Sequence, residues 1–298
     1  MPFVATSSLN VHYQISGEEH YPWLVLINGL ADDVSTWDPQ VPAFAEAGYR
    51  VLTYDNRGIG RTTSLPDAKD PKPYTSELLA NDLHELLNLL KIDKYHLLGI
   101  SMGGMIAQSF ALAYPNDSTE GSEILSLSLC CTYAAPSLFC SRMFALWADM
   151  AQRMSIRDVM KDVTLWAFTV PFFLNRPAEV KEVDEAMDGL QMPLEEYLAQ
   201  LNVIQTFDST AALAKLAAEG KGLANLPPSK VMVLAGVEDI LIPVLLSSQL
   251  ERAIPDCRWW TTRGGHACSL EFSEEFNASV LQFLNSLQHR RKIVAKQQ

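Results

Sequence analysis

The sequence lacks the features that mark membrane and secreted proteins. Polar residues interrupt every apolar run before it reaches the roughly 18 residues that a membrane-spanning helix needs. The N-terminal segment Met1–His20 has no basic stretch followed by an apolar core, so no signal peptide is predicted. We therefore expect a cytoplasmic protein without membrane insertion.

Cysteine and basic residues are too few for several further classes of function. The five cysteines are odd in number and none are spaced as C-x-x-C, so we expect free, mostly buried thiols rather than disulfides or a zinc site. Lys and Arg total 23 against 35 Asp and Glu, a net charge of −12. An acidic surface repels phosphate backbones, so no nucleic-acid partner is expected.

Strands and helices alternate along most of the chain. After a hairpin at 3–16, short apolar runs predict strands at 23–27, 49–54, 95–100, 124–131, 231–235 and 258–262. Helical patterns are present at 37–47, 75–92, 101–113, 243–254 and from residue 273 onward. This alternation predicts an α/β fold in which a mostly parallel, eight-stranded sheet is flanked by helices.

The alternation stops between residues 134 and 215, where the pattern is helical and rich in aromatic residues and methionine. We interpret 1–133 and 216–298 as the core, and 134–215 as a helical lid inserted after strand 6. Ligands of open α/β sheets bind beyond the carboxyl ends of the strands, where such a lid would lie. Its aromatic excess favours a fairly hydrophobic substrate. Trp166 and Trp147 are the lid residues expected to contact that substrate, although packing would also account for either one.

A candidate nucleophile lies between a predicted strand and a predicted helix. The segment from Gly99 to Gly103 reads G-x-S-x-G, and the strand–turn–helix context is what this motif requires. The glycines leave room for a tight, strained turn that exposes the Ser101 hydroxyl. The turn also places Ser101 at a helix N-terminus, which favours developing negative charge.

A serine hydroxyl needs a base, and the base needs a group that orients it. Of the six histidines, only His266 follows a predicted strand in a glycine loop, on the same sheet edge as Ser101. The carboxylate should follow another strand end, and both Glu238 and Asp239 meet that condition. Along the chain the serine comes first, the carboxylate second and the histidine last, which is the order found in α/β-hydrolases.

An oxyanion hole would need two backbone donors. One is the N–H of Met102, which follows the nucleophile, and the other comes from the loop after the strand at 23–27. Gly29 permits a sharp turn in that loop, so the N–H of Leu30 is the expected second donor. Asn28, beside it, is expected to line the substrate site.

Several motifs together resemble the α/β-hydrolase superfamily along nearly the whole chain, and within it the 3-oxoadipate enol-lactonase and small-ester hydrolase branch. They are Asn28-Gly29-Leu30, Ser35-Thr36-Trp37, Pro39-Gln40-Val41, the loop 54–62 and the elbow 99–104. The resemblance implies Asp239 as the acid, because this loop usually reads G-x-x-D-x-x-x-P in that family. Thr62 stands where the family usually has Ser, and many members have His in place of Asn28. Neither change removes a backbone donor.

The expected function is hydrolysis of a small ester or lactone through an acyl-enzyme on Ser101, without a metal or organic cofactor. One alternative is hydrolysis of a carbon–carbon bond in a dienone or β-diketone, which the same triad serves. Another is a non-enzymatic receptor that binds a small molecule on a hydrolase scaffold. The oligomeric state is left open, with a homodimer as one option.

Overall fold

Nine strands form a single sheet in the computed structural model, which describes residues 2–116 and 122–294. The strand order is β1-β2-β4-β3-β6-β7-β8-β9, and β5 pairs with β2 outside this path. The strands are β1 Phe3–Ala5, β2 Leu9–Ser16, β3 Trp23–Ile27, β4 Arg50–Tyr54, β5 Thr63–Ser64, β6 Lys94–Ile100, β7 Glu123–Cys130, β8 Val231–Gly236 and β9 Arg258–Thr262.

The sheet is mostly parallel, as predicted. Strands β4, β3, β6, β7, β8 and β9 pair in parallel, while β1, β2 and β5 pair antiparallel. All eight predicted strands are present. The additional strand, β5, has two exposed residues, Thr63 and Ser64, and carries no apolar pattern that could have predicted it.

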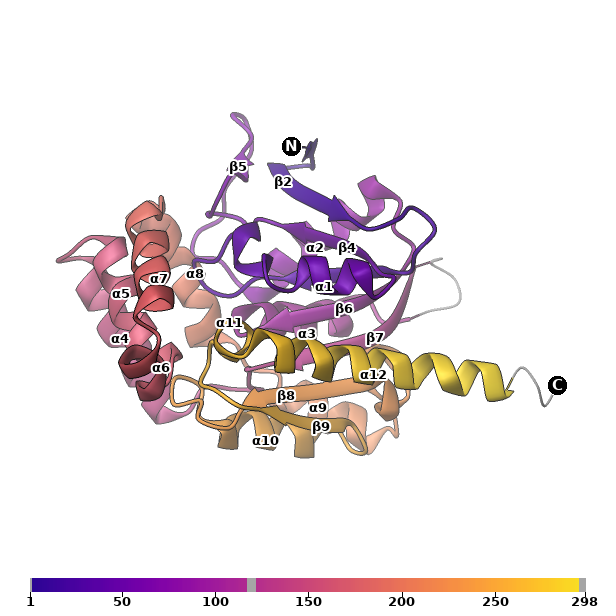
Figure 1. The fold of residues 1–298 in the computed structure, drawn as a ribbon. Helices are drawn as coiled ribbons and strands as arrows, with labels where there is room; N and C mark the ends of the chain where they lie inside the picture. Colours follow the sequence, from indigo (N-terminus) through magenta and orange to yellow (C-terminus); the bar gives the residue numbers. More distant parts are fainter. Residues whose placement is uncertain (1, 117–121, 295–298) are drawn as a thin grey trace.

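Helices cover both faces of the sheet because its central strands present apolar side chains to each side. In β3, Val25 and Ile27 belong to one buried cluster, while Leu24 and Leu26 belong to another. The first cluster is covered by α2 Ser76–Leu90, α3 Met102–Ala113 and α10 Val244–Ala253, and the second by α1 Val41–Glu46 and α12 Ser273–Val294. Figure 1 shows α1 and α12 together in front of the sheet.

One predicted helix begins later than expected. We expected it to begin at Trp37, whereas the structure has a 3₁₀ turn, η1 Val34–Trp37, and then α1 from Val41. Pro42 lies in the first turn of α1, where its missing N–H costs no hydrogen bond. The remaining short helices are η2 Leu223–Asn225, η3 Pro228–Lys230 and α11 Cys268–Glu271.

Six helices lie between β7 and β8, in the segment where the strand pattern stops. They are α4 Leu138–Ala151, α5 Ile156–Ala167, α6 Val170–Asn175, α7 Pro177–Gly189, α8 Leu194–Thr206 and α9 Thr210–Ala218. We call α4–α8 the helical insertion. The hydroxyls of Ser137, Ser155 and Thr169 cap the starts of α4, α5 and α6. In Figure 1, α4–α7 lie beyond one end of the sheet, and α8 lies between them and the core.

The helical insertion is bonded to loops that follow the strands of the core. The N–H of Ala267, in the loop after β9, donates to the carbonyl of Ala167 at the end of α5 at 2.9 Å. The buried Glu271 carboxylate accepts from the backbone N–H groups of Thr169, at 3.2 Å, and Gly265, at 3.4 Å. The carboxyl end of the sheet is therefore joined to the insertion.

No helix in the described parts of the chain is long and apolar enough to cross a bilayer. All five cysteines are free, as expected, and four of them are buried. The Sγ atoms of Cys131 and Cys268 lie 3.5 Å apart.

Candidate active site

Ser101 occupies a sharp turn between β6 and α3. Its φ of 54° and ψ of −119° are backbone angles that residues other than glycine seldom adopt. The turn is packed closely on both sides. A Cβ on Gly99 would lie 2.1 Å from the carbonyl oxygen of Gly103, and a Cβ on Gly103 would lie 2.1 Å from that of Ile27. The two glycines are therefore steric requirements of the elbow.

The structure brings Ser101 and His266 into hydrogen-bonding contact. His266 lies in the loop after β9, and its Nε2 is 2.9 Å from Oγ of Ser101. Its Nδ1 is 2.8 Å from Oδ2 of Asp239, which follows β8. Glu238, the other carboxylate considered, is exposed to solvent. The residues come from the carboxyl ends of β6, β9 and β8, so the parallel sheet explains their convergence.

Asp239 is held in place independently of His266. Its Oδ1 accepts the backbone N–H of Ile242 at 2.9 Å, and its side chain is fully buried. Burial lowers the pKa of His266, but the charge and hydrogen bond of Asp239 raise it more, and the pKa reaches about 9. Asp239 therefore both orients the imidazole and stabilises its protonated form.

The loop after β3 lies against Ser101, the candidate nucleophile. A Cβ on Gly29 would lie 3.6 Å from Cβ of Ser101. Among the residues that the structure describes, the N–H groups of Leu30 and Met102 donate no hydrogen bond to a protein acceptor. Such unsatisfied donors beside a nucleophile can accept the charge of an oxyanion. Their role as the oxyanion hole stays a prediction.

The amide nitrogen of Asn28 holds the loop after β3 to the core. Its side chain is fully buried, and Nδ2 donates to the carbonyls of Tyr54, at 3.2 Å, and Asp32, at 3.3 Å. These bonds tie the loop to the end of β4. The amide nitrogen is thus committed to backbone acceptors, whereas Oδ1 has no hydrogen-bond partner among the described residues. The substrate contact of Asn28 stays a prediction.

The two tryptophans predicted to contact substrate share one acceptor. The indole N–H groups of Trp147 and Trp166 donate to Oδ2 of Asp162 at 3.0 and 3.3 Å. Trp147 is 1% exposed and packs inside the helical insertion, whereas Trp166 is half-buried beside Phe139. This burial favours a packing role for Trp147. The substrate contacts of Trp147 and Trp166 stay predictions.

Sequence reasoning missed two polar residues that lie in, or bond to, the loop after β3. Burial raises the pKa of Asp32 to about 6, although the charge of His266 and the Thr36 hydroxyl lower it. Gln200, in α8, bonds to the backbone of the same loop. The acidic pair Asp32-Asp33 beside Gly29-Leu30 was a visible signal, whereas no motif surrounds Gln200.

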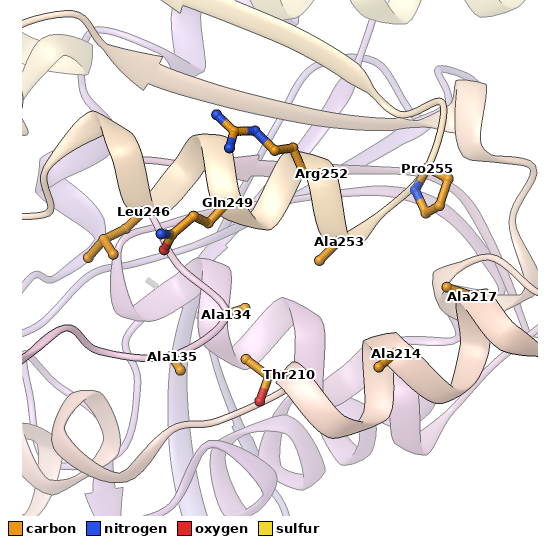
Figure 2. Close-up of a pocket in the computed structure, with 10 residues that line it drawn as sticks. All are labelled: Ala134, Ala135, Thr210, Ala214, Ala217, Leu246, Gln249, Arg252, Ala253 and Pro255. Atoms are coloured by element: carbon orange, nitrogen blue, oxygen red, sulfur yellow. The ribbon is translucent and has the colours of Figure 1, made fainter.

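A surface pocket between α9 and α10 is separate from the candidate active site (Figure 2). Its lining is mostly small and aliphatic, and contains none of Ser101, Asp239 and His266. Within residues 2–116 and 122–294, no group of three or more His, Cys, Asp or Glu side chains is arranged to hold a metal ion.

Related proteins share this architecture. A curated relative is the "Putative carbamate hydrolase RutD" of Variovorax paradoxus, 27% identical over 92% of this chain and 96% of the relative. A protein of the same name from Escherichia coli O139:H28 is 30% identical over 91% and 94%. The enol-lactonase from Burkholderia xenovorans LB400 superimposes with a TM-score of 0.79 at 26% identity, covering 95% of this chain and all of that one.

A hydrolase from Pseudomonas aeruginosa PA01 superimposes with a TM-score of 0.78, also at 26% identity, over 95% of this chain and 97% of its own. The sequence matches the alpha/beta hydrolase fold family over residues 22–273, which is most of the core and all of the helical insertion. With the strand order, the elbow and the position of the insertion, this match establishes that the chain belongs to the α/β-hydrolase fold family.

Proposed function

We propose that this protein is a serine hydrolase that cleaves a carboxylic ester or lactone through an acyl-enzyme on Ser101. One observation carries the proposal: His266 lies 2.9 Å from the Ser101 hydroxyl and 2.8 Å from Asp239. A base within hydrogen-bonding reach of a hydroxyl, itself oriented by a carboxylate, is the arrangement that nucleophilic catalysis requires.

In acylation, Oγ of Ser101 attacks the carbonyl carbon while Nε2 of His266 takes the hydroxyl proton. The carbonyl oxygen becomes an oxyanion, which the N–H groups of Leu30 and Met102 stabilise. His266 then gives its proton to the leaving alkoxide, and the carbon–oxygen bond breaks. Asp239 accepts the Nδ1–H of His266 throughout and holds the imidazolium in place.

In deacylation, a water molecule takes the place of the alcohol. His266 removes a proton from the water, whose oxygen attacks the acyl carbon, and a second oxyanion forms in the same hole. Its collapse returns the proton to Oγ of Ser101 and releases the acid. With a lactone, the alcohol is part of the acyl group, stays on the enzyme after acylation, and leaves at this step within a single hydroxy acid. No part of this cycle needs a group outside the chain and water.

We assign the lid role to residues 134–215, in which the aromatic residues favour a small, fairly hydrophobic substrate. Phe139 and Trp166 stack edge to face with ring centres 6.1 Å apart, and both are partly accessible. The relatives' printed names, carbamate hydrolase and enol-lactonase, extend the substrate range worth testing to carbamates.

A fluorophosphonate probe and a substrate panel test the proposal. The wild type should label covalently and turn over at least one of a p-nitrophenyl ester series, a lactone or a carbamate. Ser101→Ala should lose both properties while its circular dichroism spectrum stays unchanged. Full activity in Ser101→Ala would refute the proposal.

The same panel separates the two competing functions. A carbon–carbon bond hydrolase would cleave a β-diketone in preference to every ester. A receptor would bind a lactone without multiple turnovers, despite normal labelling at Ser101. Either pattern in the wild type would replace the ester or lactone assignment.

A further inference from the structure

Gln200 belongs to the helical insertion, yet both polar atoms of its side chain bond to the core. Its Oε1 accepts the backbone N–H of Ala31 at 3.0 Å, and its Nε2 donates to the carbonyl of Arg57 at 2.6 Å. The side chain is fully buried. Breaking either bond would leave a buried polar group without a partner, so the amide is strongly held.

Ala31 is the residue that most needs such support. It has a φ of 59°, in the left-handed region that favours glycine, and it directly follows Leu30. Strained backbone of this kind persists where its surroundings hold it. The direction of the Ala31 N–H sets the peptide plane between Leu30 and Ala31, and hence the path of the chain at Leu30.

The acceptor on the other side of Gln200 is also well anchored. The guanidinium of Arg57 is 2% exposed and donates to both carboxylate oxygens of Asp82, at 2.9 and 2.6 Å, and to Asp70 at 3.1 Å. These charge-assisted bonds hold the backbone around Arg57 in place. Gln200 therefore joins the loop after β3 to a rigid point of the core.

The helix that carries Gln200 is clamped one turn earlier. The Glu196 carboxylate accepts from Nζ of Lys72 at 2.6 Å and from the hydroxyl of Tyr74. Asn202, further along α8, donates to the carbonyl of Tyr74 at 2.8 Å. Because α8 is bonded to the core on both sides of Gln200, the position of the Gln200 amide is fixed relative to the core.

We propose that Gln200 is a positioning residue, which holds the loop carrying the Leu30 N–H in the geometry that stabilises the oxyanion. This inference rests on the proposed function, since it requires that N–H to be a donor. The helical insertion then takes part in catalysis through α8, in addition to covering the site.

Gln200→Met tests the inference, because methionine keeps the length of the side chain and removes both hydrogen bonds. Loss of a whole oxyanion donor costs roughly 100- to 1,000-fold in kcat, and a displaced donor should cost about 10-fold. We expect KM to change less than kcat, because the oxyanion exists only after attack.

A pair of substrates reports directly on the oxyanion hole. Sulfur accepts hydrogen bonds poorly, so a thionoester gains less than its oxygen ester from the Leu30 and Met102 donors. The ratio of kcat/KM for the oxygen ester to that for the thionoester should therefore fall about 10-fold in Gln200→Met. A purely structural role would lower both rates alike and leave this ratio unchanged.

Gln108 provides a matched control. It is also fully buried, and its Nε2 donates to the carbonyls of Gly104 and Tyr133 at 3.2 and 3.0 Å. Gln108→Met should lower the melting temperature in the same way without altering the oxygen-to-sulfur ratio. An unchanged ratio in Gln200→Met, or an equal fall in both variants, would overturn the inference.

Two further measurements keep the outcomes distinct. If Gln200→Met does not fold, Gln200→Asn keeps an amide but is one methylene too short to reach both Ala31 and Arg57, and an unchanged ratio in that variant would also overturn the inference. A wild type that neither labels with fluorophosphonate nor hydrolyses an ester would instead defeat the proposed function itself.

Discussion

The backbone at Ser101 shows how steric limits act on single residues. The elbow leaves no space for a side chain at Gly99 or Gly103, because the nearest carbonyl oxygens already lie where a Cβ would be. The glycine spacing was visible in the sequence for this reason. The tight packing on both sides of the turn explains why the motif tolerates no larger residue.

Gly103→Ala should therefore destabilise the fold and abolish most activity. Its new methyl group would meet the Ile27 carbonyl at 2.1 Å, and overpacking of this kind costs about 1–3 kcal/mol. Urea unfolding measures the change. Gly189→Ala is the control, because a Cβ at Gly189 meets nothing within 4 Å. Equal midpoints for the two variants would contradict the steric argument.

The charge of Asp239 should govern the pH dependence. In the proposed mechanism His266 acts as a base only when neutral, and its pKa is raised to about 9. We expect kcat/KM to increase with pH as His266 loses its proton. This rise should occur at a higher pH than the ordinary histidine pKa of about 6.5. Asp239→Asn should move that rise to lower pH and reduce kcat by about 10⁴-fold. Glu238→Gln, the exposed neighbour, should leave the profile unchanged.

Asp32 should influence the same rise more weakly. Its negative charge contributes to the raised pKa of His266, after Asp239 and Cys131. Asp32→Asn should therefore shift the rising limb to lower pH while retaining far more activity than Asp239→Asn. Rate profiles of the three proteins between pH 5 and about 10 make this comparison. A shift toward higher pH in Asp32→Asn would contradict the assigned sign.

At the scale of elements, apolar patterning predicted strands better than helix boundaries. The continuous burial of β3 follows from its unbroken apolar run, and the buried face of α2 follows from its leucine stripe. The apolar pattern did not predict the late start of α1 or the two-residue strand β5, because each depends on local contacts rather than on an apolar face.

A buried ion pair and an exposed one should contribute differently to stability. Asp82, on α2, pairs with Arg57, whose side chain is 2% exposed. Asp82→Asn leaves a buried cation with a weaker partner, so we expect a loss of about 3 kcal/mol in the free energy of unfolding. Glu123→Gln breaks an exposed pair with Lys94 and should cost less than about 1 kcal/mol. Urea titration of both variants gives the comparison, and similar losses would refute it.

At the scale of the whole molecule, the topology explains which parts of the site could be predicted. Ser101, Asp239 and His266 follow parallel strands, and parallel strands bring their carboxyl ends to one edge. Their meeting is therefore implied by the order of strands alone. The bond between Gln200 and Ala31 joins residues 169 positions apart and depends on how α8 packs. No pattern in either segment encodes that packing.

The hydrogen bond from Ala267 to Ala167 has a consequence for engineering. It joins the residue after His266 to α5, just as Gln200 joins α8 to the loop after β3. Replacing the helical insertion with that of another hydrolase would remove both hydrogen bonds at once, even if the new insertion fitted against the sheet. A chimera with altered selectivity should consequently retain the end of α5 and the first two turns of α8. Only the segment between them, which contains α6 and α7, should be exchanged.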